Sequence, residues 1–179
     1  MFKYLGILFI FITADLVAQD IPDYKGEYVF TNSRVSMKGI RELITHEEEG
    51  KRTIQFNAKF PLGRIKIISD FFEKNNLISS KQYYVDAKVL IRSDKRTLTF
   101  DRSSGTLTSK GKFEWSQALL KNENVFDPLN VQIQIRRNVI AGLKDFSLML
   151  PDLKTGAIEA NNYKVVDSGS FEVDGTDYP

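Results

Sequence analysis

The chain has 179 residues, of which 42% are hydrophobic and 12% aromatic, which is enough apolar material for one domain with a core. Its 25 Lys and Arg residues against 23 Asp and Glu residues give a formal net charge of +2, so we expect no nucleic-acid partner and no membrane binding through bulk charge. The chain has no Cys and a single His, which excludes disulfides, thiolate nucleophiles and Cys/His zinc or iron–sulfur sites.

The first segment, 1–18, has the layout of a secretory signal peptide. A basic start precedes the apolar run Leu5–Ile12, and small residues end at Ala18. The run is shorter than the ~18–20 apolar residues of a spanning helix and Asp15 closes it, so a retained anchor and a buried N-terminal helix are the weaker alternatives. We expect cleavage after Ala18, leaving 19–179 as a single periplasmic or otherwise extracytoplasmic domain without a transmembrane segment.

The clearest strand pattern in the chain is at Arg52–Phe60. Four apolar residues there alternate with polar ones and are predicted to share one buried face: Ile54, Phe56, Ala58 and Phe60. A charged turn with Gly50 precedes this strand, so Val35–His46 and Arg52–Phe60 are predicted to form a long hairpin.

Turn signals continue along the chain at intervals of roughly 8 to 12 residues, the spacing of an all-β sandwich or barrel. The predicted turns are Pro61–Gly63, Asn75–Asn76, Ser93–Lys95 and Asp101–Gly105. We see no linker that would divide the chain into two domains.

The segment after Phe126 carries two conflicting signals. Asp127 followed by Pro128 is typical of a helix start. Yet apolar and polar residues alternate over 129–136, which is a strand pattern, while Leu129, Ile133 and Ile140 also share a helical stripe. Periodicity alone leaves both alternatives open. After Gly142, strands are predicted again at 146–150, 158–166 and 170–173.

Several of these motifs, in this order, resemble landmarks of the bacterial DUF3108 family, which are exported proteins of unknown function. The motifs are Phe100–Gly105, Asp127–Leu129 followed by Ile135–Arg136, Phe146–Leu148 and Tyr163–Val165. The resemblance covers about Tyr24 to Val173 and implies an all-β fold with minor α content: an antiparallel curved sheet or open half-barrel with one short helix. The sheet that the resemblance implies is broadly similar to the open half-barrels of periplasmic lipoprotein carriers and lipoprotein-insertion factors. The resemblance also implies a helix at Asp127–Asn138 and further strands beyond Pro179, and it supplies no catalytic residue.

The polar residues that could carry chemistry have simpler structural interpretations. His46 lies beside Glu47–Glu49, but neighbouring strand side chains point to opposite faces, so we interpret this cluster as a solvated hairpin rather than a metal site. Four aspartates lie at turns or before a helix start, where they accept hydrogen bonds from backbone N–H groups: Asp94, Asp101, Asp127 and Asp152. We therefore expect no enzymatic activity, no metal and no cofactor.

Aromatic residues on the predicted strands, together with the apolar side of the helix, are the candidates for a ligand-binding surface. They are Phe56, Phe60, Phe100, Phe113, Trp115, Leu129 and Ile133. The alternative is that they fill an ordinary core. If the curved sheet does not close, these side chains line a concave apolar surface, which favours a carrier of a lipid or other apolar ligand. In that case the emission of Trp115 should report ligand binding, and Ile133→Trp should fill the cavity. The second hypothesis is an envelope structural or assembly factor that binds a protein partner through a sheet edge.

Overall fold

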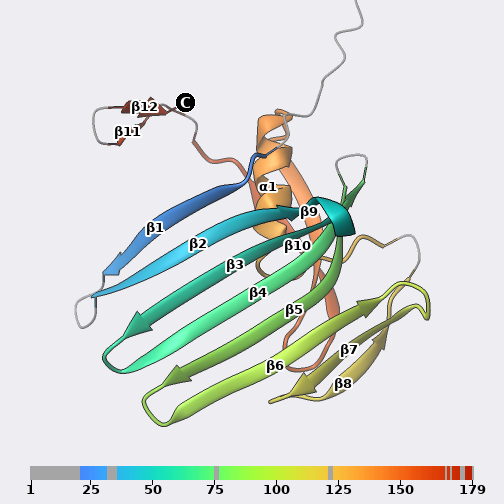
Figure 1. Cartoon of the computed structure of the whole chain (residues 1–179). Coiled ribbons are helices and arrows are strands. Elements are labelled where there is room, and N and C mark those ends of the chain that lie inside the picture. The colour runs from blue at the N-terminus through green and yellow to red at the C-terminus, as the bar shows by residue number, and fades with distance from the viewer. Residues whose placement is uncertain are drawn as a thin grey trace, which may run out of the picture.

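The computed structural model of the protein describes residues 21–31, 36–74, 77–120, 123–167, 169, 171–173 and 176–178. In this part of the chain, eight strands form one open antiparallel sheet in sequence order (Figure 1). They are β1 Tyr24–Thr31, β2 Ser36–His46, β3 Lys51–Phe60, β4 Gly63–Lys74, β5 Leu77–Val89, β6 Arg92–Asp101, β7 Thr106–Gly111 and β8 Trp115–Ala118. The predicted signal peptide 1–18 and the turn at Asn75–Asn76 lie outside the described residues.

One face of the sheet, which we call the inner face, is buried because the register aligns apolar positions on adjacent strands. A single row crosses β2 to β6 through Leu43, Ile54, Ser69, Tyr83 and Leu98, and all five side chains are buried. Their chain neighbours point to the other face, as the pleat requires.

The predicted β2–β3 hairpin is confirmed, with Gly50 in the left-handed conformation at its turn. Ile54 and Ala58 are buried as expected, whereas Phe56 and Phe60 are only half-buried. The inner face is therefore covered completely over part of β3 and incompletely over the rest.

A one-residue register shift in β5 keeps its apolar side chains on the inner face. The shift places Lys81 as an extra residue opposite β4. As a result Ser80 and Ile78 follow Tyr83 onto the buried side, while Lys81 is exposed. Strict alternation would have turned Lys81 inward.

The helix predicted at the Asp127–Asn138 segment is confirmed as α1, Val131–Ile140, and the strand alternative is wrong. The Asp127 carbonyl accepts a hydrogen bond from the Val131 N–H at 3.1 Å. Its carboxylate Oδ1 accepts the N–H groups of Leu129 and Asn130 at 2.8 and 2.9 Å. These contacts satisfy backbone donors of the turn at 128–130 that leads into α1, so local hydrogen bonding outweighs the alternating pattern.

The cover of the inner face consists of α1, the described residues 119–120 and 123–130 before it, and a hairpin of β9 Asp145–Pro151 with β10 Ile158–Lys164 (Figure 1). The predicted strands at 146–150 and 158–166 are thus confirmed, but they cross the inner face as a separate pair rather than extending the large sheet. A short pair, β11 Phe171–Val173 with β12 Thr176–Tyr178, follows.

The turn predicted at Ser93–Lys95 is wrong, because the chain reverses earlier, at Leu90 and Ile91. Leu90 has a φ of 54°, the left-handed conformation that such a tight turn requires. Asp94 instead lies inside β6, where its carboxylate accepts the Arg96 Nε at 2.8 Å. A polar residue typical of turns therefore serves as an ion-pair partner within a strand.

Candidate functional site

A pocket of about 390 Å³ lies between the inner face of β1–β4 and the start of α1. We call it the helix–sheet pocket. Its lining residues are Tyr28, Arg41, Phe56, Ile67, Leu129 and Gln132. The volume falls within the ~300–1,000 Å³ of small-molecule sites, and apolar side chains form most of the wall, as in such sites generally.

Register and a glycine position the wall of this pocket. Arg41, Phe56 and Ile67 are direct neighbours on β2, β3 and β4. The Phe56 ring lies over Gly39, where a Cβ atom would come within 2.5 Å of the ring carbons. Only glycine at this position lets the ring lean across the sheet, which is the close approach for which glycine is suited.

The polar part of the pocket is formed by Arg41 and Gln132. Arg41 Nη1 donates a hydrogen bond to Gln132 Oε1 at 2.5 Å, and Gln132 Nε2 donates to the Pro128 carbonyl at 3.3 Å. The Arg41 Nε is shielded from solvent and has no hydrogen-bond partner. Burial raises the pKa of the nearby Tyr24 phenol, and the positive charge of Arg41 acts against that rise.

A buried hydrogen-bond network holds the start of α1 on the inner face beside the pocket. Ser69 Oγ on β4 donates to Asp127 Oδ2 at 2.6 Å, and Asn130 Nδ2 donates to Ser80 Oγ on β5 at 2.9 Å. Ser80 Oγ donates in turn to the Val125 carbonyl at 3.0 Å. Burial raises the pKa of the Asp127 carboxyl to about 7, although the hydrogen bonds that it accepts oppose the shift.

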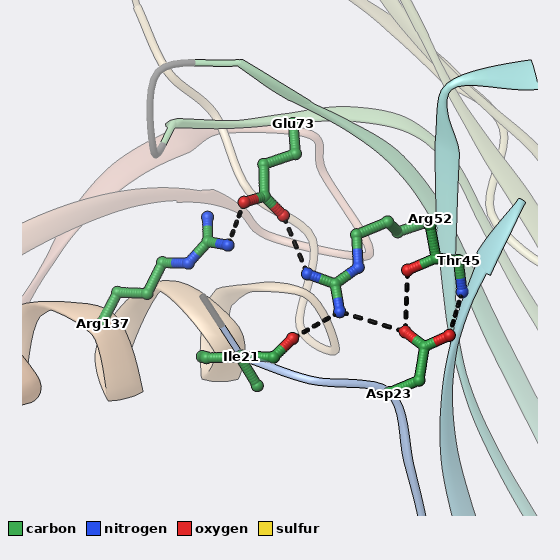
Figure 2. Close-up of polar contacts among 6 residues, drawn as sticks. All are labelled: Ile21, Asp23, Thr45, Arg52, Glu73 and Arg137. Carbon is green, nitrogen blue, oxygen red and sulfur yellow. Dashed lines mark hydrogen bonds and ion pairs between the residues drawn. The ribbon is translucent and has the colours of Figure 1, made fainter. Parts of the chain in front are cut away.

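A second network, shown in Figure 2, holds the other end of α1. Arg52 on β3 donates to the Ile21 carbonyl at 2.6 Å, to Asp23 Oδ1 at 3.2 Å and to Glu73 Oε2 at 3.0 Å. Glu73 also forms an ion pair with Arg137 near the end of the helix. The Arg52 guanidinium therefore joins the first described residues to β3 and β4, and Glu73 extends the network to α1.

The structure separates the candidate ligand-lining residues. Phe56 and Leu129 meet in the helix–sheet pocket. Phe100 and Ile133 belong to the buried core, with 5% and 1% of their surfaces exposed. Ile140, which the helical stripe groups with Leu129 and Ile133, is instead substantially exposed.

The remaining aromatic candidates lie elsewhere. Phe60 ends β3 outside the helix–sheet pocket. Phe113 lies between β7 and β8, with the Arg96 guanidinium 5.1 Å from its ring centre. Trp115 begins β8 and its Nε1 donates to the Leu153 carbonyl at 3.4 Å. Trp115 therefore contacts the β9–β10 loop and is not placed to report on this pocket.

The sequence interpretation missed four lining residues: Tyr28, Arg41, Ile67 and Gln132. One signal was available for Arg41, because it occupies the same alternating face of β2 as Gly39 and the buried Leu43. A cation at an inward position of a strand indicates either an internal ion pair or a functional site.

The other polar candidates have structural surroundings. His46 Nε2 lies 3.0 Å from Thr53 Oγ1, and Glu47–Glu49 form an exposed turn of 3₁₀ helix, in agreement with the solvated-hairpin interpretation. Among the described residues, no group of three or more His, Asp or Glu side chains could hold a metal ion. Likewise, no helix in the described part of the chain has the length and apolar character needed to cross a bilayer.

Comparisons of the chain with models of protein families, with curated proteins and with solved structures gave no match, so the resemblance to the DUF3108 family stays a prediction.

Proposed function

We propose that this protein is a non-catalytic binding or carrier protein for a lipid or other apolar ligand, and that the helix–sheet pocket holds this ligand. The observation that carries the proposal is an open pocket whose wall is formed by Phe56, Ile67 and Leu129. Apolar surface left facing water favours an apolar occupant by about 25 cal/mol for each Å² that the occupant covers. An extracytoplasmic location rests on the signal-peptide prediction for 1–18.

Two features of the surroundings support a preformed pocket. The start of α1 is held by the network around Asp127, and its end by the pair of Arg137 with Glu73. A buried hydrogen bond or ion pair is costly to break. We therefore propose that the ligand enters past Tyr28, at the exposed rim on β1, without displacement of the helix.

Ile67→Trp tests the proposal, because the larger side chain should fill the pocket. Its matched control is Ile68→Trp, which places the same side chain on the opposite face of the same strand. Calorimetric titration with lauryl alcohol, a neutral apolar probe, should show saturable binding to the wild type and to Ile68→Trp, and at least tenfold weaker binding to Ile67→Trp. The Ile133→Trp substitution expected from the sequence is unsuitable, because Ile133 lies in the packed core and the change would overpack it.

A second candidate function rests on the open ends of the sheet. β1 has no neighbour on its outer side among the described strands, and Val29 on this edge is 60% exposed. Such an edge can accept a strand from another protein. If neither lauryl alcohol nor an ionic ligand with the same chain binds the wild type, the carrier proposal is refuted and an envelope assembly factor that binds a partner strand becomes the better hypothesis.

A further inference from the structure

The arginines on or beside the inner face differ in their partners. Three have side chains that are no more than 8% exposed, and each pairs with a carboxylate: Arg52 with Asp23 and Glu73, Arg96 with Asp94, and Arg137 with Glu73. Arg102 instead donates to the Glu123 carbonyl at 2.7 Å. Arg41 points to the inner face, where its guanidinium contacts two neutral groups, the Gln132 amide and the Tyr24 phenol. Within the described residues, Arg41 makes no ion pair, and the residues that line its pocket include no acid.

The hydrogen-bonding capacity of Arg41 is incompletely used. One terminal nitrogen bonds Gln132 and the guanidinium also lies against the Tyr24 phenol, while Nε has no hydrogen-bond partner and no contact with solvent. A guanidinium in largely apolar surroundings gains more from an anion than one in water, because the local dielectric constant is lower. The positive charge therefore lies beside the apolar wall of Phe56, Ile67 and Leu129 without a protein anion to balance it.

We infer that the helix–sheet pocket takes a single-chain amphiphile with a carboxylate head, such as a fatty acid, and that Arg41 binds the carboxylate while the chain lies on Phe56, Ile67 and Leu129. The inference rests on the proposed function and adds the class of ligand. A carboxylate is favoured over a phosphate dianion because one guanidinium lines the pocket, and a second negative charge there would lack a partner. Gln132 holds the guanidinium in place when the pocket is empty and can release it to the stronger, charge-assisted partner.

The experiment compares ligands that share one chain and differ only in the head: laurate, lauryl alcohol, lauryl phosphate and lauryl trimethylammonium. Each is titrated calorimetrically into the full chain, below its micellar concentration. The wild type should bind laurate about tenfold to a hundredfold more tightly than lauryl alcohol, because a hydrogen bond to a charged group contributes more than a neutral one. Lauryl trimethylammonium should bind more weakly than the alcohol.

Three variants locate the effect. Arg41→Gln should remove the preference, so that the ratio of laurate affinity to alcohol affinity falls to about one. Arg41→Lys should retain part of the preference, because it keeps the charge and loses the planar fork of donors. The matched control is Arg64→Gln, which removes the same charge from an exposed side chain that pairs with Asp86 on the outer side of β4 and β5, and it should bind laurate like the wild type.

The outcomes separate the inference from the proposed function. Equal binding of laurate and lauryl alcohol to the wild type overturns the inference and leaves the carrier proposal standing. Tighter binding of lauryl phosphate than of laurate overturns the choice of a carboxylate. If none of the ligands binds, both are overturned. The wild-type comparison of head groups needs no substitution, so it decides the matter even if an Arg41 variant fails to fold.

Discussion

The buried carboxyl group of Asp127 should make the stability of the protein rise as the pH falls from about 8 to about 5. Burial raises its pKa in the folded protein to about 7, whereas the unfolded chain should titrate near the ordinary aspartate value of about 4. Between these two pKa values the folded state holds a proton that the unfolded state has released. Lowering the pH therefore favours folding, by about 1.4 kcal/mol for each pH unit and on the order of 4 kcal/mol in total.

Asp127→Asn isolates this effect, because an amide does not titrate and its oxygen can still accept the N–H groups of Leu129 and Asn130. Urea unfolding measured between about pH 5 and about pH 8 should give a wild-type free energy that falls as the pH rises, and a much flatter curve for the variant. The two proteins share every other titratable group, so the difference between their curves isolates Asp127. Parallel curves would refute the conclusion that Asp127 binds its proton near neutral pH. Below about pH 4 both proteins should lose stability, because hydrogen bonds hold the pKa values of Asp101 and Asp152 below the ordinary value.

Two further substitutions test the contacts that hold the cover on the sheet. Arg52→Met should lower the free energy of unfolding by about 2–4 kcal/mol, because it removes the buried partner of the Asp23 and Glu73 carboxylates. Its control, Arg64→Met on the exposed side, should cost under about 1 kcal/mol. Equal losses in urea unfolding would contradict a stabilising role of the Arg52 network. Gly156→Ala would place a Cβ atom 2.6 Å from the Trp115 ring, whereas Gly142 has the same φ of 80° and nothing within 4 Å. Gly156→Ala and the control Gly142→Ala should each lower the free energy of unfolding by about 1 kcal/mol, because alanine is strained in the left-handed conformation. Gly156→Ala should cost more than this and shift the Trp115 emission, because of the clash with the ring. The same emission shift in Gly142→Ala would show that the contact with Trp115 is not its cause.

Local patterns in the sequence determined most of the secondary structure. The alternation around Ile54 and Ala58 predicted a strand with one buried face, and Gly50 predicted the turn before it. Asp127 with Pro128 marked the turn that leads into α1, three residues before the helix begins at Val131, because a carboxylate that accepts free N–H groups acts within a few residues of chain. Such signals depend on neighbours in sequence, so they can be recognised without the fold.

Only the tertiary structure decided which apolar residues form the core and which line a pocket. Phe56 and Phe100 both lie at alternating positions of strands, yet Phe56 lines the pocket at the margin of the cover, while Phe100 lies beneath the cover. The position of the cover across the sheet sets this difference, and it depends on contacts between segments far apart in the chain. Arg41 depends on them in the same way, because only the packing of α1 over β2 places an unpaired cation beside an apolar wall.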